Sequence, residues 1–233
     1  MQVGLAENPM IGCPALETGE HITAARKAFR ELNAPFLTTV LEGAYPDFYL
    51  QQEGDDAPVF TDEEMKLIGA PLDFVGLNMF NPTLVRADAN DPKGWSTVPL
   101  ADSHPKMVMD WLSFWPEIAY WGPRFVKELW GVESVYITEN GCAAKDKLNL
   151  KGEVLDTDRL LYLRRHFQQA SRAVTEGWPL KGYFVWSMLD NFEWAHGYDR
   201  RFGIVYVNYT TLERTPKLSA RFVQETIRSR SVV

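Results

Sequence analysis

Polar side chains follow apolar runs of strand length at three places in this 233-residue chain. Asn78 follows Val-Gly-Leu, Glu139 follows Val-Tyr-Ile-Thr, and Asp190, Asn191 and Glu193 follow Phe-Val-Trp-Ser-Met-Leu. In parallel α/β proteins the reactive side chains gather at the C-terminal ends of the strands. We therefore expect the chemistry of this protein to lie at these three strand ends.

Glu139 is the clearest candidate for a reactive carboxylate. It stands directly at the end of an apolar strand, so it is expected to be desolvated and to face the open end of the fold. Asn140 and Gly141 behind it would let the backbone turn sharply away. From position alone, a helix-capping or loop acid is an equally good interpretation.

Glu193 lies among four aromatic residues, Trp186, Phe192, Trp194 and Tyr198. A carboxylate can accept hydrogen bonds from paired hydroxyl groups while an indole face stacks on C–H groups, which is an arrangement suited to a sugar. The eight tryptophans of the chain also indicate a flat ligand, because a buried indole N–H needs a partner. Composition alone nevertheless favours a plain aromatic cluster under a loop, with Glu193 as a surface acid.

The sequence lacks the motifs that other kinds of catalysis would require. The chain has no pair of histidines at i, i+4 spacing for zinc and no Gly-x-Ser-x-Gly motif for a serine nucleophile. Cys13 and Cys142 have no metal-type spacing and are interpreted as reduced residues of a cytosolic protein. No histidine is placed to activate Cys142, which we interpret as a small loop residue. We expect no metal and no cofactor.

Charge and hydropathy exclude two classes of partner. The 24 Lys and Arg residues against 31 Asp and Glu residues give a formal charge of −7, so the basic surplus of a nucleic-acid-binding protein is missing. The longest uncharged stretch, Phe74 to Val85, is shorter than the ~18 residues of a membrane helix, and no secretory signal precedes it. We expect a cytoplasmic globular protein that binds neither nucleic acid nor membranes.

Alternating strand and helix patterns predict a parallel α/β fold. The predicted strands are Gln2–Ala6, Asp73–Phe80, Ser134–Thr138 and Gly182–Leu189. The predicted helices are His21–Leu32, Ala34–Leu41, Thr61–Leu67, Glu117–Trp130, Thr157–Glu176 and a last one after Pro216. The sheet could be open and doubly wound or part of a (β/α)8 barrel. The absence of any Gly-x-Gly pair argues against a nucleotide-binding open sheet.

Local signals define several element ends. Thr61 and Glu64 form a capping box, and Gly131 occupies the position after a helix where glycine is favoured. Asn81–Lys106 is expected to be a long irregular segment and Gly203–Tyr209 a hairpin-like stretch. Gly182–Leu189, a continuous apolar run, is expected to be buried on both faces.

Three segments together resemble glycoside hydrolase family 1, the β-glucosidase and β-galactosidase family. Val135–Gly141 (VYITENG) resembles the nucleophile motif of the family. Trp186–Phe202 (WSMLDNFEWAHGYDRRF) resembles its last strand and sugar-binding loop, and Asp73–Asn78 (DFVGLN) its sixth strand. The order and spacing agree over essentially the whole chain, and the combination of I-T-E-N-G with D-N-F-E-W is highly specific.

The resemblance implies a role for each matching residue. Glu139 would be the catalytic nucleophile, and Glu193 would hold the outer hydroxyls of the terminal sugar. The remaining matches are Trp186 beneath that sugar, Trp194 at its hydroxyls, Phe202 near its hydroxymethyl group and Asn78 beside the nucleophile. Phe80 departs from the family, which usually has a tyrosine there whose hydroxyl bonds the nucleophile. Its loss is expected to raise the pKa of Glu139 or to leave the carboxylate less firmly oriented. Trp111 and Leu112 do not align cleanly with the family, so we assign no site there.

A second catalytic carboxylate is missing from this chain. Retaining glycosidases use two carboxyl groups ~5–5.5 Å apart, and in this family the general acid/base lies in a Thr-Phe-Asn-Glu-Pro motif. The nearest look-alike here is Glu7-Asn8-Pro9, in which the order is reversed. The resemblance therefore implies one half-barrel domain over residues 1–233, with strands five to eight of a (β/α)8 TIM barrel and without the N-terminal half.

Several functions remain open at this point. The chain could be the nucleophile half of a retaining β-glucosidase that hydrolyses terminal β-D-glucosyl residues of a β-glucoside or short oligosaccharide, active only with the N-terminal half. It could be a non-catalytic sugar-binding or self-assembling module, because half a barrel leaves two open strand edges that seek partners. An unrelated barrel enzyme such as an aldolase ranks last, since no lysine stands at a strand end.

Overall fold

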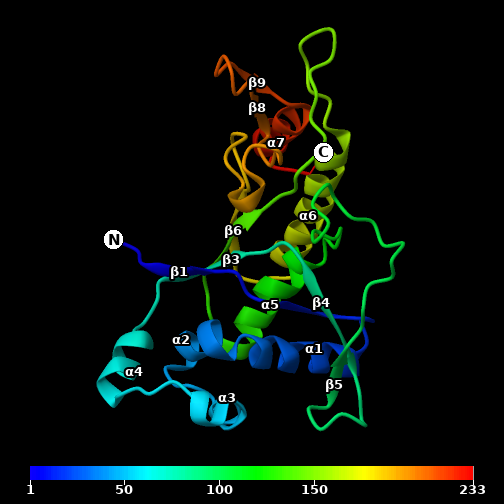
Figure 1. Cartoon of the computed structure of the whole chain (residues 1–233). Helices are drawn as coiled ribbons and strands as arrows, with labels where there is room; N and C mark the ends of the chain where they lie inside the picture. Colours follow the sequence, from blue (N-terminus) through cyan, green and yellow to red (C-terminus); the bar gives the residue numbers. More distant parts are fainter. Residues whose placement is uncertain (233) are drawn as a thin grey trace.

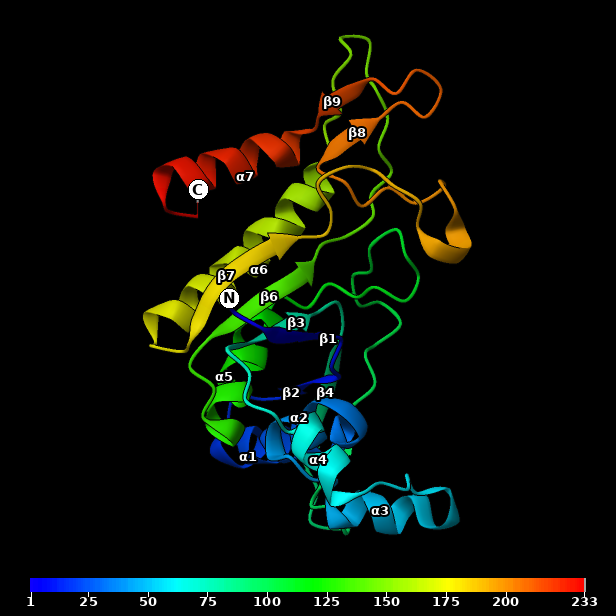
Figure 2. The same cartoon turned by 90° about the vertical axis from the view of Figure 1, so that its left-hand side faces the viewer.

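A parallel sheet organises the computed structural model, which describes residues 1–232. Its four strands lie in the order β1 (Gly4–Glu7), β3 (Phe74–Asn78), β6 (Val135–Asn140) and β7 (Leu180–Val185), and every neighbouring pair is parallel. Figure 2 shows these strands side by side, with α6 running along β6 and β7. Each of the four predicted strands is present, which confirms the parallel α/β prediction.

Helices connect the strands. They are α1 (Gly19–Leu32), a π-helical turn (Ala34–Thr38), α2 (Thr39–Glu42), α3 (Asp47–Glu53), a 3-10 turn (Gly54–Asp56), α4 (Asp62–Ile68), α5 (Ile118–Trp130), α6 (Thr157–Thr175), a 3-10 turn (Trp194–His196) and α7 (Leu218–Ser229). Of these, α5 and α6 pack against the sheet. Helices α2 to α4 and helix α7 lie at opposite ends of the molecule (Figures 1 and 2). Within residues 1–232, none of the helices combines the length and the apolar character needed to cross a bilayer.

Local signals set the predicted helix ends. At the start of α4, the Glu64 backbone N–H donates to Thr61 Oγ1 at 3.2 Å, and the Thr61 N–H donates to Glu64 Oε2 at 2.8 Å. This reciprocal pair is the predicted capping box. Helix α5 ends at Gly131, whose φ of 70° is in the left-handed region that favours glycine.

Two buried clusters form the core. The larger one packs β3 and β6 against α1 and α5, with Leu77, Phe29 and Phe125 fully buried. The smaller one lies under the C-terminal ends of β6 and β7 and includes Tyr162 and Phe202. The second cluster matters for function because it lies directly below the strand ends where polar side chains gather.

The segment Asn81–Lys106 is not irregular throughout, which corrects part of the prediction. It contains β4 (Pro82–Ala87) and β5 (Trp95–Thr97), and β4 pairs in parallel with β2 (Ile11–Pro14), a strand that was not predicted. These strands are only three to six residues long, and a proline ends β2 and begins β4. The predicted helix Ala34–Leu41 is likewise divided into the π-helical turn and α2.

Strand β7 is not buried on both faces, which also corrects the prediction. It ends at Val185 rather than at Leu189, and the Phe184 side chain is 58% exposed. β7 is also an edge strand of the open sheet, so no strand pairs with its outer side. The predicted hairpin-like stretch Gly203–Tyr209 contains only β8 (Val205–Val207). Its antiparallel partner β9 (Arg214–Pro216) lies beyond the predicted bounds.

Candidate active site

A cavity of about 700 Å³ opens at the C-terminal ends of the sheet strands. It is lined by Asn8, Pro9 and Met10 after β1, by Asn78, Phe80, Asn81, Pro82 and Thr83 at and after β3, by Trp111, by Glu139 of β6, and by Trp186, Glu193, Trp194 and Phe202 after β7. All six predicted site residues therefore face one cavity, although they are spread over positions 78 to 202 of the sequence.

Glu139 is held at a register shift between β3 and β6. Leu77 pairs with Ile137, but Asn78 pairs with Glu139, so Thr138 is passed over. The Thr138 hydroxyl donates to Asn78 Oδ1 at 2.7 Å. Because this bond occupies the carbonyl oxygen of the Asn78 amide, the N–H side of the amide remains available to the Glu139 carboxylate.

Asn140 fixes the end of β6 from behind. It is fully buried, and its Nδ2 donates to the Met79 carbonyl at 2.6 Å and to the Tyr162 hydroxyl oxygen at 3.1 Å. The Tyr183 hydroxyl donates to Asn140 Oδ1. One amide thus joins β3, β6, β7 and α6 immediately next to Glu139, and this restricts where the carboxylate can lie.

Gly141 allows close packing of two strand ends and does not form the sharp turn that the sequence predicted. It is not among the glycines with positive φ, but a Cβ at this position would lie 1.9 Å from the Trp186 carbonyl oxygen. The Trp186 N–H donates to the Asn140 carbonyl at 2.9 Å. Glycine is therefore required so that the ends of β6 and β7 can approach closely, which brings Trp186 to the side of Glu139.

Burial raises the proton affinity of both cavity carboxyls. Burial raises the pKa of Glu139, the Asn78 amide lowers it in part, and the negative charge of Glu193 raises it further. Glu193 is only 8% exposed, and burial raises its pKa, against the opposing effects of His196 and a hydrogen bond from the Trp186 side chain. Each carboxyl therefore keeps its proton to a higher pH than an ordinary glutamate.

Aromatic rings form the floor and the rim of the cavity. The Phe80 ring meets Trp111 edge-on at a centroid distance of 6.0 Å and Phe202 at 6.5 Å. Phe202 is 3% exposed and belongs to the second core cluster, whereas Trp194 is 82% exposed on the rim. The floor is consequently fixed by packing, and the rim is open to solvent.

Two further residues line the cavity that were not assigned to the site from the sequence. Asn8 directly follows β1, and Asn78 is the last residue of β3, so a polar residue ends the apolar run in both places. Trp111 was left without a site because it does not align cleanly with the family. The structure corrects this, since Trp111 lines the cavity and its ring meets Phe80 edge-on.

Metal and thiol chemistry find no support at this site. Within residues 1–232, no group of three or more His, Cys, Asp or Glu side chains is arranged to hold a metal ion. Cys142 is fully buried, and burial raises the pKa of its thiol, so it does not supply a thiolate. The polar side chains that line the cavity, besides its aromatic residues, are two carboxyl groups, three amides and the Thr83 hydroxyl.

The fold and the site define a class: a parallel α/β half-barrel with carboxylates and indoles at its strand ends, the arrangement of a glycoside hydrolase. The sequence model of glycosyl hydrolase family 1 matches residues 1–232. The chain belongs to this family.

Relatives with known names are similar over nearly the whole chain. The 1,4-beta-D-glucan glucohydrolase of Thermotoga neapolitana is 42% identical over 229 residues, which is 98% of this chain and 51% of the relative. Beta-glucosidase A of Thermotoga maritima is 41% identical over 229 residues, with the same 98% and 51%. The chain thus spans about half the length of the curated relatives it matches.

Solved structures agree with this half-length match. The family 1 β-glucosidase from Thermotoga maritima superposes with a TM-score of 0.82 and 39% identity, covering 100% of this chain and 52% of that one. The same enzyme in complex with deoxynojirimycin gives the same values. The fold is therefore half of a (β/α)8 barrel, as the resemblance implied.

Proposed function

We propose that this chain is the nucleophile-bearing half of a retaining β-glycosidase of the β-glucosidase type. It would act on terminal non-reducing β-D-glucosyl residues of a β-glucoside or short oligosaccharide. The observation that carries the proposal is the convergence of Glu139, Glu193, Trp186 and Phe202 on one cavity at the strand ends. The β-glucosidase relatives support it.

Glu139 serves as the nucleophile in this proposal. Its carboxylate oxygen attacks the anomeric carbon, the bond from that carbon to the leaving oxygen breaks, and a general acid protonates the leaving oxygen. Water then attacks the anomeric carbon of the glycosyl-enzyme, Glu139 departs as carboxylate, and the same acid, now a base, accepts the proton of the water. The Asn78 amide supports the charged form of Glu139 that both steps require.

The remaining cavity residues hold the sugar. Glu193 accepts hydrogen bonds from outer hydroxyls, Trp186 lies beneath the ring, and Trp194 contacts hydroxyls from the rim. Phe202 lies near the hydroxymethyl group, where its burial in the second core cluster keeps the ring in place. Carboxylate and indole faces together suit a polar ring whose C–H groups point to one side.

The general acid/base comes from a partner in this proposal. Glu139 and Glu193 are the only carboxylates that line the cavity within residues 1–232, and both already have roles. Residues 1–233 then form a single half-barrel domain, and the N-terminal half-barrel supplies the second catalytic carboxylate. The open edges of β1 and β7 are where such a half would pair, because an edge strand leaves its N–H and C=O groups unpaired.

Complementation tests this proposal directly. The chain is mixed with the N-terminal half of Thermotoga maritima beta-glucosidase A, and hydrolysis of an aryl β-glucoside is measured. Glu139→Gln should reduce turnover by about 10³-fold or more, since a catalytic nucleophile is lost. The matched control is Glu225→Gln, which removes an exposed carboxylate of α7 and should leave turnover unchanged. Equal turnover in the Glu139→Gln mixture and the unsubstituted mixture contradicts the assignment.

A second candidate is a sugar-binding module that acts without catalysis. It is favoured by one observation: the wall formed by Trp186, Glu193 and Phe202 lies entirely within this chain. Calorimetric titration of the isolated chain with glucose and cellobiose separates the two functions. Binding without hydrolysis in the isolated chain, and no hydrolysis in the complemented mixture, would support the module.

A further inference from the structure

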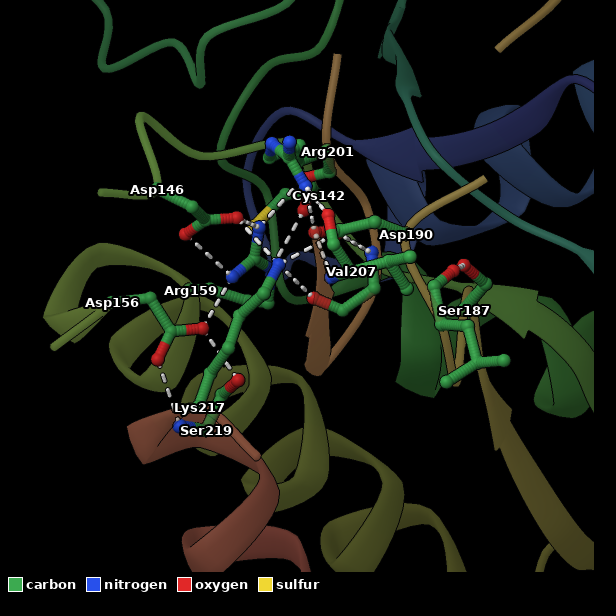
Figure 3. Close-up of polar contacts among 12 residues, drawn as sticks. Cys142, Asp146, Asp156, Arg159, Ser187, Asp190, Arg201, Val207, Lys217 and Ser219 are labelled. Atoms are coloured by element: carbon green, nitrogen blue, oxygen red, sulfur yellow. Dashed lines mark hydrogen bonds and ion pairs between the residues drawn. The ribbon is translucent and has the colours of Figure 1, made fainter. Parts of the chain in front are cut away.

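A network of buried charges lies behind the cavity wall, and none of its members lines the cavity. It consists of three carboxylates and three cations, namely Asp146, Asp156 and Asp190 with Arg159, Arg201 and Lys217 (Figure 3). Five of these side chains are completely inaccessible to solvent, and that of Arg201 is 17% exposed. The formal charges balance, as burial at this depth requires.

Lys217 stands at the centre of the network. Its Nζ donates to Asp146 Oδ2 at 2.6 Å, to Asp190 Oδ1 at 2.7 Å and to the Gly203 carbonyl at 2.6 Å. An ammonium group has three protons, so every donor is used. Asp190 and Gly203 lie near the two ends of the segment 186–203, which we call the wall loop because it carries Trp186 and Glu193.

Asp190 closes the base of the wall loop. Its Oδ2 accepts from Arg201 Nη1 at 2.6 Å and from the Val207 N–H at 3.3 Å, and its Oδ1 also accepts from the Gly203 N–H at 3.1 Å. A Cβ at Gly203 would lie 2.1 Å from the Asp190 backbone nitrogen. The two ends of the loop are therefore pressed together, and one carboxylate and one ammonium hold them there.

Arg159 connects the wall loop to the segment that follows Glu139. Its Nη2 donates to the Arg201 carbonyl at 2.6 Å, directly before Phe202, and its Nε donates to the Cys142 carbonyl at 3.1 Å. It also forms a two-pronged pair with Asp146, at 3.0 and 2.7 Å. The network thus holds the backbone at two places beside the cavity. One is the Arg201 carbonyl next to Phe202, and the other is the Cys142 carbonyl, three residues beyond Glu139.

We propose that Lys217 and its partners are positioning residues that fix the wall loop, and with it Glu193 and Phe202, in the arrangement presented to the cavity. Charges buried this deeply add little net stability compared with well-packed apolar side chains, but they strongly disfavour any arrangement that separates them. The consequence for sugar affinity rests on the proposed function; the consequence for loop order does not.

Lys217→Met in the full chain tests the proposal. Methionine keeps the length of the side chain but leaves Asp146 and Asp190 without their shared donor. The control is Lys147→Met, an exposed lysine on the same loop as Asp146. Amide hydrogen exchange of the wall loop should become about tenfold faster or more in Lys217→Met, while exchange in α1, remote from the cluster, stays unchanged. The control should leave both regions unchanged.

Titration with deoxynojirimycin provides a second measurement. Affinity should fall about tenfold in Lys217→Met, because a mobile loop must be ordered again on binding. If the unsubstituted chain does not bind this sugar mimic, that result counts against a sugar site in the isolated chain, while the exchange data still decide the role of Lys217.

Two exchange results would overturn the proposal: unchanged exchange in the wall loop, or equal acceleration throughout the chain. If Lys217→Met does not fold, the milder Asp190→Asn is measured in the same way, since it removes a charge but keeps the shape. If neither variant folds, the cluster holds the whole fold together and the positioning role is wrong.

Discussion

The carboxyl groups of Glu139 and Glu193 influence each other across the cavity. Burial raises the pKa of both, and the charge of Glu193 raises that of Glu139 further. Phe80, which lines the cavity without a hydroxyl to offer, leaves Asn78 as the side chain that supports the ionised form of Glu139. The protonation state of Glu139 is thus controlled by very few neighbours.

Removing the neighbouring charge should lower the pKa of Glu139. In Glu193→Gln the repulsion disappears while the side chain keeps its shape, so Glu139 should ionise at a lower pH than in the unsubstituted chain. A pH titration followed by carbon-13 NMR of labelled glutamate side chains measures this directly, with Glu225→Gln as the control. An unchanged or raised pKa in Glu193→Gln would show that the two carboxyls do not interact.

Glu7 should make stability depend on pH. Burial raises its pKa, and its Oε2 has no hydrogen-bond partner within residues 1–232. Because the folded pKa is raised, the folded state binds the proton more tightly than the unfolded state, so the charged form destabilises the fold above the folded pKa. Glu7→Gln should therefore raise the free energy of unfolding at pH 7. The difference should vanish below about pH 4, where glutamate is protonated in both states.

Urea unfolding of Glu7→Gln and of the unsubstituted chain at pH 7 and pH 4 measures the effect. A stability difference that stays the same at both pH values would show that ionisation of Glu7 is not its cause.

At the scale of elements, the contact between the ends of β6 and β7 is the tightest constraint on the site. Gly141 lies so close to Trp186 that a single methyl group has no room. Gly19, at the start of α1, has no heavy atom within 4 Å of the position that a Cβ would take. The two glycines therefore form a matched pair for substitution.

Gly141→Ala should destabilise the fold by about 1–3 kcal/mol, since the strand ends must move apart to accept the methyl group. Gly19→Ala should change stability by less than about 0.5 kcal/mol, because its surroundings are open. Denaturant unfolding measures both values. If the two variants are equally stable, the close approach of Gly141 to Trp186 is not a constraint in solution.

Element prediction from the sequence succeeded where the signal is local. The capping box of α4 and the glycine end of α5 each depend on residues within four positions of one another. Strands β2 and β4 were missed because each is short and has a proline at one end, which in a sequence is typical of a loop. Their pairing, as of Ile11 with Pro82, joins positions about 70 residues apart. Nothing within a short window of sequence reports such a contact.

The same distinction between local signals and distant contacts applies to the candidate site. The position of Glu139 at a strand end was predictable, because the apolar run before it and the turn after it are adjacent in sequence. The burial of Glu193 was not predictable, since composition alone favoured a surface acid, and it depends on the folding of the wall loop. The charged cluster was also invisible, because Asp146, Asp190 and Lys217 are scattered through 72 positions.

For the whole molecule, the open edges of the sheet are the dominant feature. Strands β1 and β7 each have a neighbour on one side only. Beside β7, an apolar groove of about 420 Å³ lies between this strand, α6 and α7. An exposed apolar edge favours association, either with an N-terminal half-barrel or with another copy of the chain.

Association through the β7 edge can be tested by size-exclusion chromatography at micromolar concentration. The isolated chain should elute above its monomer mass of 26.6 kDa. Phe184→Lys, which places a charge on the edge strand, should shift the chain towards the monomer. The control is Phe36→Lys, because Phe36 is also exposed, at 67% against 58%, but lies outside the sheet. A clean monomer for the unsubstituted chain contradicts the expectation.

The buried position of the charged cluster has a consequence for tolerance of ionic strength. Dissolved ions screen pairs that face solvent, such as Arg172 with Glu17, which ties α6 to the loop before α1. They have little access to Lys217 and Asp190, whose side chains are completely covered. Concentrated salt should therefore loosen the ion pairs at the periphery of the molecule while the cavity wall keeps its shape. The cavity should consequently tolerate high ionic strength better than the surface around it.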